Sequence, residues 1–125
     1  MDVTLIVPAR VDSILARFAS ASNFADLMRA GVKIHRFHGG LLHTKSITID
    51  GAASIFGSVN LDMRSMWLNF EISLFIYDSE FTTTLKSLQN EYLLDSDQLE
   101  LGAWDQRPIL RKITENAARL VGPLI

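Results

Sequence analysis

The chain carries the stretch LLHTKSITIDG at residues 41–51, which predicts a strand followed by a hairpin turn. Isoleucine and threonine alternate before the turn, as is typical of strands. The dipeptide Asp50-Gly51 is a strong signal for a tight turn between two antiparallel strands. The returning strand is then expected at residues 54–56.

Within this predicted strand, side chains two residues apart point to the same face. His43 and Lys45 are therefore expected to project together, on the face that also carries Ile47 and Ile49. Because that face is apolar, we expect a partly desolvated imidazole and ammonium. An ammonium in such surroundings binds a phosphate more strongly than it does in water.

Apolar patterning along the chain predicts an α/β fold, in which a mixed α+β sheet is flanked by helices. The apolar strands are expected to be covered on both sides. Residues 95–104 are expected only to connect two helices, and a break is expected near residues 20–23. The predicted strands are 2–7, 32–37, 42–49, 54–56 and 70–77, and the predicted helices are 14–30 (capped by Asp12-Ser13), 81–94 and 107–124.

The composition is that of a globular domain, with 125 residues, 48% hydrophobic and 21% charged. A formal net charge of −2 argues against a generally basic nucleic-acid surface, so no nucleic-acid partner is expected. The sequence has no cysteine, which excludes disulfide frameworks, zinc ribbons and thiol nucleophiles. No apolar run approaches the roughly 20 residues needed to span a bilayer.

All three histidines, His35, His38 and His43, fall between Asp26 and Asp50, a segment that has basic but no acidic residues. This predicts a local positive field suited to a small anionic group, with an ordinary solvated basic surface as the alternative. A metal site of the three histidines is not expected, because neither cysteine nor a nearby carboxylate accompanies them.

A second polar group follows the hairpin. Ser58 and Asn60, in the stretch GSVN at 57–60, are two apart at the end of the returning strand and can offer a hydroxyl and an amide to one pocket. Glu71 opens the next predicted strand and offers a carboxylate that can hold an imidazole in one tautomer.

These residues resemble the phospholipase D superfamily, whose HKD signature is H-x-K-x-x-x-x-D followed by G-S-x-N. The similarity extends over essentially the whole chain. It resembles the second, C-terminal catalytic half of bacterial cardiolipin synthases in the runs LLHTKSITIDG, GSVNLDMRSMWLNFEISLFIYD, LIVPARVDS, RPILRKI and GPLI.

The resemblance implies catalytic-site roles for His43, Lys45, Asp50, Asn60 and Glu71. His43 would be the nucleophile that attacks a phosphodiester phosphorus, or the acid that protonates the leaving alcohol. Glu71 would orient it. Asp50 belongs to the signature more as a structural anchor than as a chemical participant.

Binding of the phosphate is implied for Lys45, Ser58 and Asn60, which would contact its non-bridging oxygens. No metal or other cofactor is expected, because lysine and asparagine neutralise the charge. The implied reaction joins two phosphatidylglycerol molecules into cardiolipin and glycerol through a phosphohistidine, at a site that admits lipid and excludes water.

The sequence departs from the family pattern in one respect. The complete active site of the family is built from two HKD motifs that face each other, and this chain carries one. We therefore expect residues 1–125 to be a single phospholipase D-like half-domain, truncated at its N-terminus. Its partner would be a second HKD half, from the same parent chain or from a homodimer. The parent is expected at the bacterial membrane, and the isolated chain is expected to be inactive.

Two other functions stay open: another phosphodiesterase of the superfamily (a phospholipid hydrolase or an endonuclease) and an inactive half-domain that only packs against a partner. For the amphipathic helix expected within residues 107–125, packing onto its own domain is favoured. A position flat on an anionic membrane is the alternative.

Overall fold

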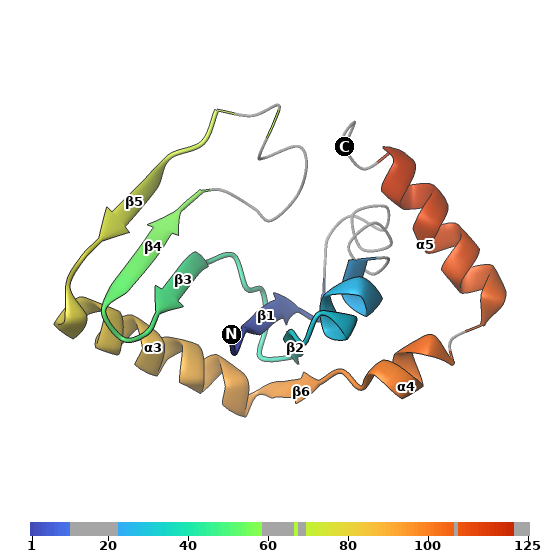
Figure 1. Ribbon diagram of the computed structural model, residues 1–125, viewed down its shortest axis with the longest axis horizontal. Helices are drawn as coiled ribbons and strands as arrows, with labels where there is room; N and C mark the ends of the chain where they lie inside the picture. Colours follow the sequence, from blue (N-terminus) through green and yellow to red (C-terminus); the bar gives the residue numbers. More distant parts are fainter. Residues whose placement is uncertain (11–22, 59–66, 68–69, 107, 122–125) are drawn as a thin grey trace.

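Two small sheets and a long helix organise the protein (Figure 1). The structure is a computed structural model that describes residues 1–10, 23–58, 67, 70–106 and 108–121. The mixture of strands and helices confirms the predicted α/β class.

The first sheet has the strand order β1-β2-β6. Strand β1 (Thr4–Pro8) runs parallel to β2 (Lys33–Phe37), and the chain between them includes a helical segment at residues 23–29. Strand β6 (Ser96–Gln98) pairs antiparallel with β2. The N-terminal part of the predicted helix at 14–30, with its cap Asp12-Ser13 and the expected break, lies outside the described residues.

The second sheet is an antiparallel meander of β3 (Lys45–Ile49), β4 (Ala53–Gly57) and β5 (Ser73–Ile76). The predicted hairpin is confirmed, with Ile47 opposite Ile55 and Ile49 opposite Ala53. Strand β3 is shorter than predicted, since it begins at Lys45 and leaves His43 in the preceding loop.

Helix α3 (Ser79–Leu94) runs along one face of the second sheet, as Figure 1 shows. It begins where Asp78 accepts a hydrogen bond from the backbone N–H of Phe81 at 2.7 Å, an N-cap that satisfies an otherwise unpaired donor. The side chain of Gln89 fixes the helix to the sheet, because it accepts from Thr48 Oγ1 at 2.8 Å and donates to Ser46 Oγ at 3.1 Å.

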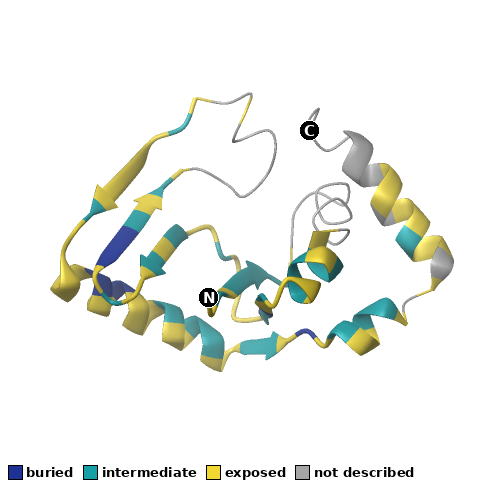
Figure 2. Ribbon diagram, viewed as in Figure 1, coloured by how far each residue is buried: buried dark blue, intermediate teal, exposed yellow. Residues whose placement is uncertain are grey.

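The expectation that the strands are covered on both sides is wrong for the second sheet. The polar face of β3 lies against α3, whereas Ile47 and Ile49 on the other face are 53% and 40% exposed. Phe75 in β5 is likewise 53% exposed. Hydrogen bonding explains why the polar face of β3 is the one that α3 covers, since α3 offers polar partners to the hydroxyl groups of the sheet. The described core is correspondingly small. Figure 2 shows buried stretches at β4 and α3 and another between β6 and α4. The buried residues are Ile34, Phe37, Ala53, Ser54, Thr82, Leu85 and Leu99.

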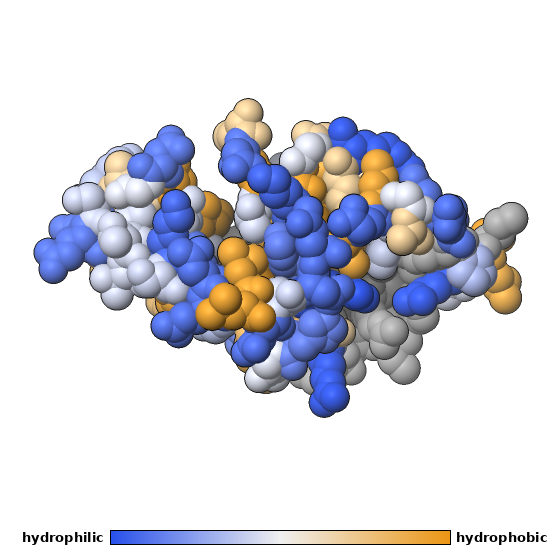
Figure 3. All heavy atoms as spheres, turned by 90° about the horizontal axis from the view of Figure 1, so that it is seen from below, coloured by the Kyte–Doolittle hydropathy of each residue, from blue (hydrophilic) through white to orange (hydrophobic). Residues whose placement is uncertain are grey.

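The outer side of this assembly is largely hydrophilic. Figure 3 views the molecule from below and shows mostly polar residues, interrupted by smaller hydrophobic groups. This agrees with the many exposed residues along α3. The covered side of α3 is therefore the one that faces the sheet.

Residues 95–104 are more structured than predicted. They contain β6 and most of α4 (Leu101–Asp105). The backbone N–H of Leu99 donates to the carbonyl of Ile34 at 2.8 Å, which continues the pairing with β2. This pairing is a contact across a long sequence separation, and the polar triplet Ser-Asp-Gln carries no local strand signal.

The last described element is α5 (Ile109–Val121), which falls within the predicted range. Its apolar stripe was expected to pack onto the domain. That expectation is wrong for the stripe's two described large side chains, Leu110 and Ile113, which are 76% and 59% exposed.

Candidate active site

The imidazole of His43 and the ammonium of Lys45 lie together, as the sequence predicted. The distance from Lys45 Nζ to His43 Nδ1 is 2.6 Å. His43 is exposed and Lys45 is half-buried, so the pair sits at the surface rather than in the partly apolar environment that was expected. A neutral imidazole that accepts this hydrogen bond at Nδ1 carries its proton on Nε2.

Strand pairing brings the two predicted polar groups toward one end of the second sheet. Lys45, the first residue of β3, lies opposite Gly57, the last residue of β4. Gly57 lies in turn opposite Ser73, the first residue of β5. The side chains that flank these positions, His43, Ser58 and Glu71, therefore enter from the same end of the sheet.

Gly57 has a structural role that the sequence pattern did not predict. A Cβ atom at this position would lie 2.3 Å from the carbonyl oxygen of Ile72 and 2.8 Å from Cα of Ser73. Only glycine permits so close an approach of β4 and β5 without a shift of the backbone. The G-S dipeptide of the motif was the available signal.

Ser58 and Glu71 are in direct contact. Ser58 Oγ donates to Glu71 Oε2 at 2.5 Å and accepts from the backbone N–H of Ile72 at 3.1 Å. The backbone N–H of Ser58 also donates to the carbonyl of Ile72 at 2.9 Å. These bonds hold the carboxylate of Glu71 beside the hydroxyl of Ser58. From the sequence, Glu71 was expected to contact the imidazole of His43 instead.

Asp50 lies in the hairpin turn, at the opposite end of β3 from Lys45. Five residue steps along a strand correspond to about 16 Å. Its φ of 50° and the φ of 69° at Gly51 are the positive values of a tight hairpin turn, which the backbone N–H of Ala52 closes by donating to the carbonyl of Ile49 at 3.0 Å. Asn60, the remaining predicted site residue, lies outside the described residues.

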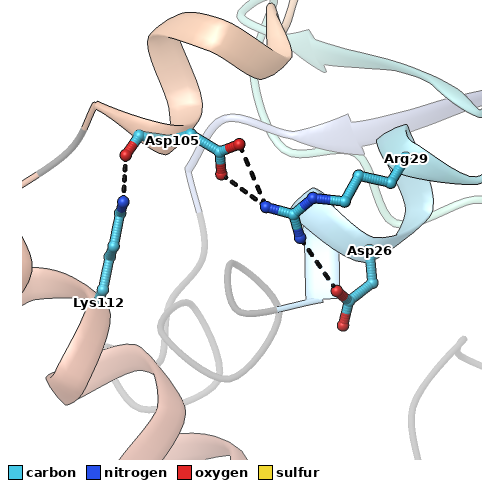
Figure 4. Close-up of polar contacts among 4 residues, drawn as sticks. All are labelled: Asp26, Arg29, Asp105 and Lys112. Atoms are coloured by element: carbon cyan, nitrogen blue, oxygen red, sulfur yellow. Dashed lines mark hydrogen bonds and ion pairs between the residues drawn. The ribbon is translucent and has the colours of Figure 1, made fainter.

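The predicted positive field between Asp26 and Asp50 is largely neutralised by carboxylates from elsewhere in the chain. Lys33 pairs with Asp2 at 2.9 Å. Arg29 pairs with Asp26 and, from α4, with Asp105 (Figure 4), and Arg36 and His38 both pair with Asp97. Apart from Asp26, which is three residues from Arg29, these partners are distant in the sequence and proximity could not reveal them. Among the described residues, Lys45 forms no ion pair.

The contact with Arg36 and His38 has an electrostatic consequence. The hydrogen bond from Arg36, with a second from His38, holds the pKa of Asp97 below its usual value of 3.8. His38 is thus committed to Asp97 on β6. In the described part of the chain, no group of three or more histidine, aspartate or glutamate side chains is placed to hold a metal ion.

Comparison with known proteins places this arrangement in a family. Residues 1–92 match the family described as "Cardiolipin synthase, PLD-like domain". The chain belongs to this family.

Curated relatives agree with that assignment. The chain is 47% identical over all of its 125 residues to proteins named cardiolipin synthase A from Salmonella arizonae, Salmonella paratyphi B and Salmonella newport. It spans 26% of the length of these relatives. No solved structure matches the chain. Among the described residues, no helix is both long enough and apolar enough to cross a membrane.

Proposed function

We propose that this chain supplies one of two HKD half-sites of a phosphatidyltransferase that makes cardiolipin at a bacterial membrane. The observation that carries the proposal is the 2.6 Å contact between Lys45 Nζ and His43 Nδ1, at the end of the sheet where Ser58 meets Glu71. Membership of the cardiolipin synthase family supports the lipid substrate.

In the first step, one imidazole of the complete site attacks the phosphorus of phosphatidylglycerol. A P–N bond forms, the P–O bond to glycerol breaks, and the opposing histidine gives its proton to the departing glycerol oxygen. In the second step, a hydroxyl of another phosphatidylglycerol attacks the same phosphorus and returns its proton to that histidine. The P–N bond breaks, and cardiolipin is released.

Lys45 is proposed to stabilise the charge on the non-bridging phosphate oxygens. An anionic phosphate competes with the neutral Nδ1 of His43 for the ammonium, because a charge-assisted hydrogen bond is roughly twice as strong as a neutral one. Binding of the lipid would thereby release Nδ1 of His43, which could then carry a proton. We propose that the Nδ1–H group donates a hydrogen bond to Oε1 of Glu71, while Oε2 of Glu71 continues to accept the hydrogen bond from Ser58.

Ser58 and Asn60 are proposed to add donors to the same phosphate oxygens. Asp50 is proposed to anchor the hairpin on which Lys45 is mounted. The proposal needs no metal or other cofactor, since Lys45 and the two donors supply the electrostatic stabilisation.

The proposed domain organisation treats residues 1–125 as one half-domain, the C-terminal half of a two-motif enzyme, with an amphipathic helix within residues 107–125. The opposing half comes from the same parent chain or from a second copy. By itself, the chain is proposed to be inactive, because one half-site provides only one of the two histidines.

The deciding experiment assembles the chain with an opposing HKD half and mixes it with phosphatidylglycerol labelled in its phosphatidyl group. After rapid acid-free quenching, mass spectrometry maps labelled histidine. Label on His43 makes it the nucleophile, and label only on the opposing histidine makes it the acid. Production of phosphatidic acid without cardiolipin would replace the transferase with a hydrolase, and robust cardiolipin synthesis by a demonstrated monomer of this chain would refute the half-site arrangement.

A further inference from the structure

A side chain of α3 binds two residues on the reverse face of β3, the face opposite to the one that carries Lys45 (Figure 1). Gln89 Oε1 accepts a hydrogen bond from Thr48 Oγ1 at 2.8 Å, and Gln89 Nε2 donates one to Ser46 Oγ at 3.1 Å. The three side chains are partly buried, so water competes weakly for these bonds. One amide therefore connects two positions of the strand to the helix.

The nearer of these two positions adjoins the candidate site. Ser46 directly follows Lys45, which is the first residue of β3. Adjacent side chains of a strand point to opposite faces. The bond between Gln89 and Ser46 therefore holds the stretch of backbone from which the Lys45 side chain leaves on the other face.

The start of β3 has few other constraints in the described part of the chain. The strand lies at the edge of its sheet, since it pairs with β4 alone in the order β3-β4-β5. The residue opposite Lys45 is Gly57, which has no side chain that could pack against the lysine. Residues 38–44 form neither helix nor strand, and they include Gly40 with a φ of 135°. A strand end of this kind opens readily unless a tertiary contact holds it.

The position of this backbone matters for the contact between Lys45 Nζ and His43 Nδ1, which are 2.6 Å apart. The lysine side chain begins on the strand, whereas the imidazole belongs to the preceding loop. Movement of the strand end would therefore displace the ammonium relative to the imidazole. Displacement of a catalytic group by about 1 Å can lower a rate by about 10²-fold.

We infer that Gln89 is a positioning residue of the proposed half-site. Its amide holds Ser46 and thereby, through the backbone, fixes the ammonium of Lys45 beside His43. The inference rests on the proposed function for the reaction that this position affects. The contact between Lys45 and His43 can also be measured without turnover.

Three variants of the full chain separate this role from ordinary packing. Gln89→Met keeps a long, unbranched side chain with good helix propensity but removes both hydrogen bonds. Gln89→Glu is the conservative rescue, because both hydroxyl groups of the strand can donate to a carboxylate. Thr82→Val is the matched control, since it removes another buried hydrogen bond between α3 and the sheet, to Ser54 on β4.

The first measurement is the ¹⁵N chemical shift of His43 Nδ1 in the full chain, with the imidazole neutral. This atom contacts the ammonium of Lys45, so Lys45→Met provides the shift that corresponds to loss of the contact. Gln89→Met is expected to move the wild-type shift most of the way to that reference. Gln89→Glu and Thr82→Val are expected to leave it at the wild-type value.

The second measurement is cardiolipin formation by the assembled enzyme. Gln89→Met is expected to lower kcat about tenfold and to change KM for phosphatidylglycerol by less than about twofold, because a displaced ammonium stabilises the transition state less well. In a Lys45→Met background the same change should cost less than about twofold, since residues that act through one contact are not additive. Gln89→Glu should recover most of the wild-type kcat, and Thr82→Val should retain it.

Far-ultraviolet circular dichroism establishes that each variant folds. If Gln89→Met does not fold, Ser46→Ala takes its place in both measurements, because it removes only the bond beside Lys45. The same shift of His43 Nδ1 and the same loss of kcat are expected from it.

Three results would overturn the inference. These are a His43 Nδ1 shift that does not respond to Gln89→Met, an equal response to Thr82→Val, and a loss of kcat that stays the same in the Lys45→Met background. Absence of cardiolipin formation by the wild-type assembled enzyme would reject the proposed function. The chemical shifts of the full chain would then still decide whether Gln89 positions Lys45.

Discussion

Lys45 Nζ lies 2.6 Å from His43 Nδ1, so the ammonium and the imidazole share one hydrogen bond at the start of β3. This contact predicts that a change at Lys45 affects chemistry more than folding. In the assembled enzyme, Lys45→Gln should lower kcat/KM for cardiolipin formation by about 10²–10³-fold, as removal of an oxyanion-stabilising donor commonly does.

Lys86→Gln is the matched control for this experiment, because Lys86 is an exposed lysine on α3. Thin-layer separation of radiolabelled lipids provides the assay. A Lys45→Gln enzyme that folds normally and retains full activity would remove Lys45 from the proposed phosphate site.

Gly57 predicts a second, structural effect. In Gly57→Ala the new methyl group would lie 2.3 Å from the carbonyl oxygen of Ile72, a backbone atom that cannot rotate away. Separation of β4 from β5 should destabilise the chain by about 1–3 kcal/mol in urea unfolding. Gly102→Ala is the control, since nothing lies within 4 Å of the added Cβ and alanine favours the helix α4. Equal stability of the two variants would contradict the close approach at Gly57.

The sequence predicted the second sheet well because its signals are local. Alternating β-branched residues set the strands, and Asp50-Gly51 set the turn. Alternation also separated the two faces of β3 correctly, but it could not decide which face would be covered. That choice depends on Gln89, which lies more than forty positions along the chain from Ser46 and hydrogen-bonds to it.

The candidate site was predictable in part for the same reason. His43 and Lys45 are two residues apart, and their contact follows from local geometry. Ser58 and Glu71 come together through the pairing of β4 with β5. The strand pattern predicted both strands but did not assign their pairing. The partner of Glu71 was not predictable, because a serine hydroxyl and an imidazole are equally suitable hydrogen-bond partners for a carboxylate.

Asp50 predicts a stability effect that depends on backbone conformation. Its φ of 50° is accessible to asparagine but costly for a β-branched residue. Asp50→Asn should therefore change the free energy of unfolding by less than about 0.5 kcal/mol, whereas Asp50→Val should cost about 1–2 kcal/mol. Urea titrations followed by circular dichroism measure both. Equal losses in the two variants would show that the carboxylate itself stabilises the fold.

Asp97 predicts how stability responds to acid. Its pKa is lowered in the folded chain, chiefly by the hydrogen bond from Arg36, so its stabilising contribution is present above the ordinary, unfolded-state pKa of 3.8. The contribution is lost as the pH falls through the lowered, folded-state pKa. Asp97→Asn should flatten the dependence of stability on pH below about pH 4, by less than about 1 kcal/mol because the pair is partly exposed. Glu91→Gln, on an exposed position of α3, should leave that dependence unchanged.

Thr82 and Ser54 join α3 to β4 through a buried hydrogen bond. Thr82 Oγ1 donates to Ser54 Oγ at 3.2 Å, and both residues are 0% exposed. Thr82→Val or Ser54→Ala alone leaves a buried hydroxyl without this partner and should cost about 1–3 kcal/mol. The double variant should cost less than the sum of the two, with a coupling of about 1 kcal/mol in a double-mutant cycle.

Thr83→Val is the control, because Thr83 is exposed and its hydroxyl donates to the carbonyl of Ser79 within the same helix. Additive losses at Thr82 and Ser54 would mean that α3 is held to the sheet by packing around these hydroxyl groups and not by the bond between them.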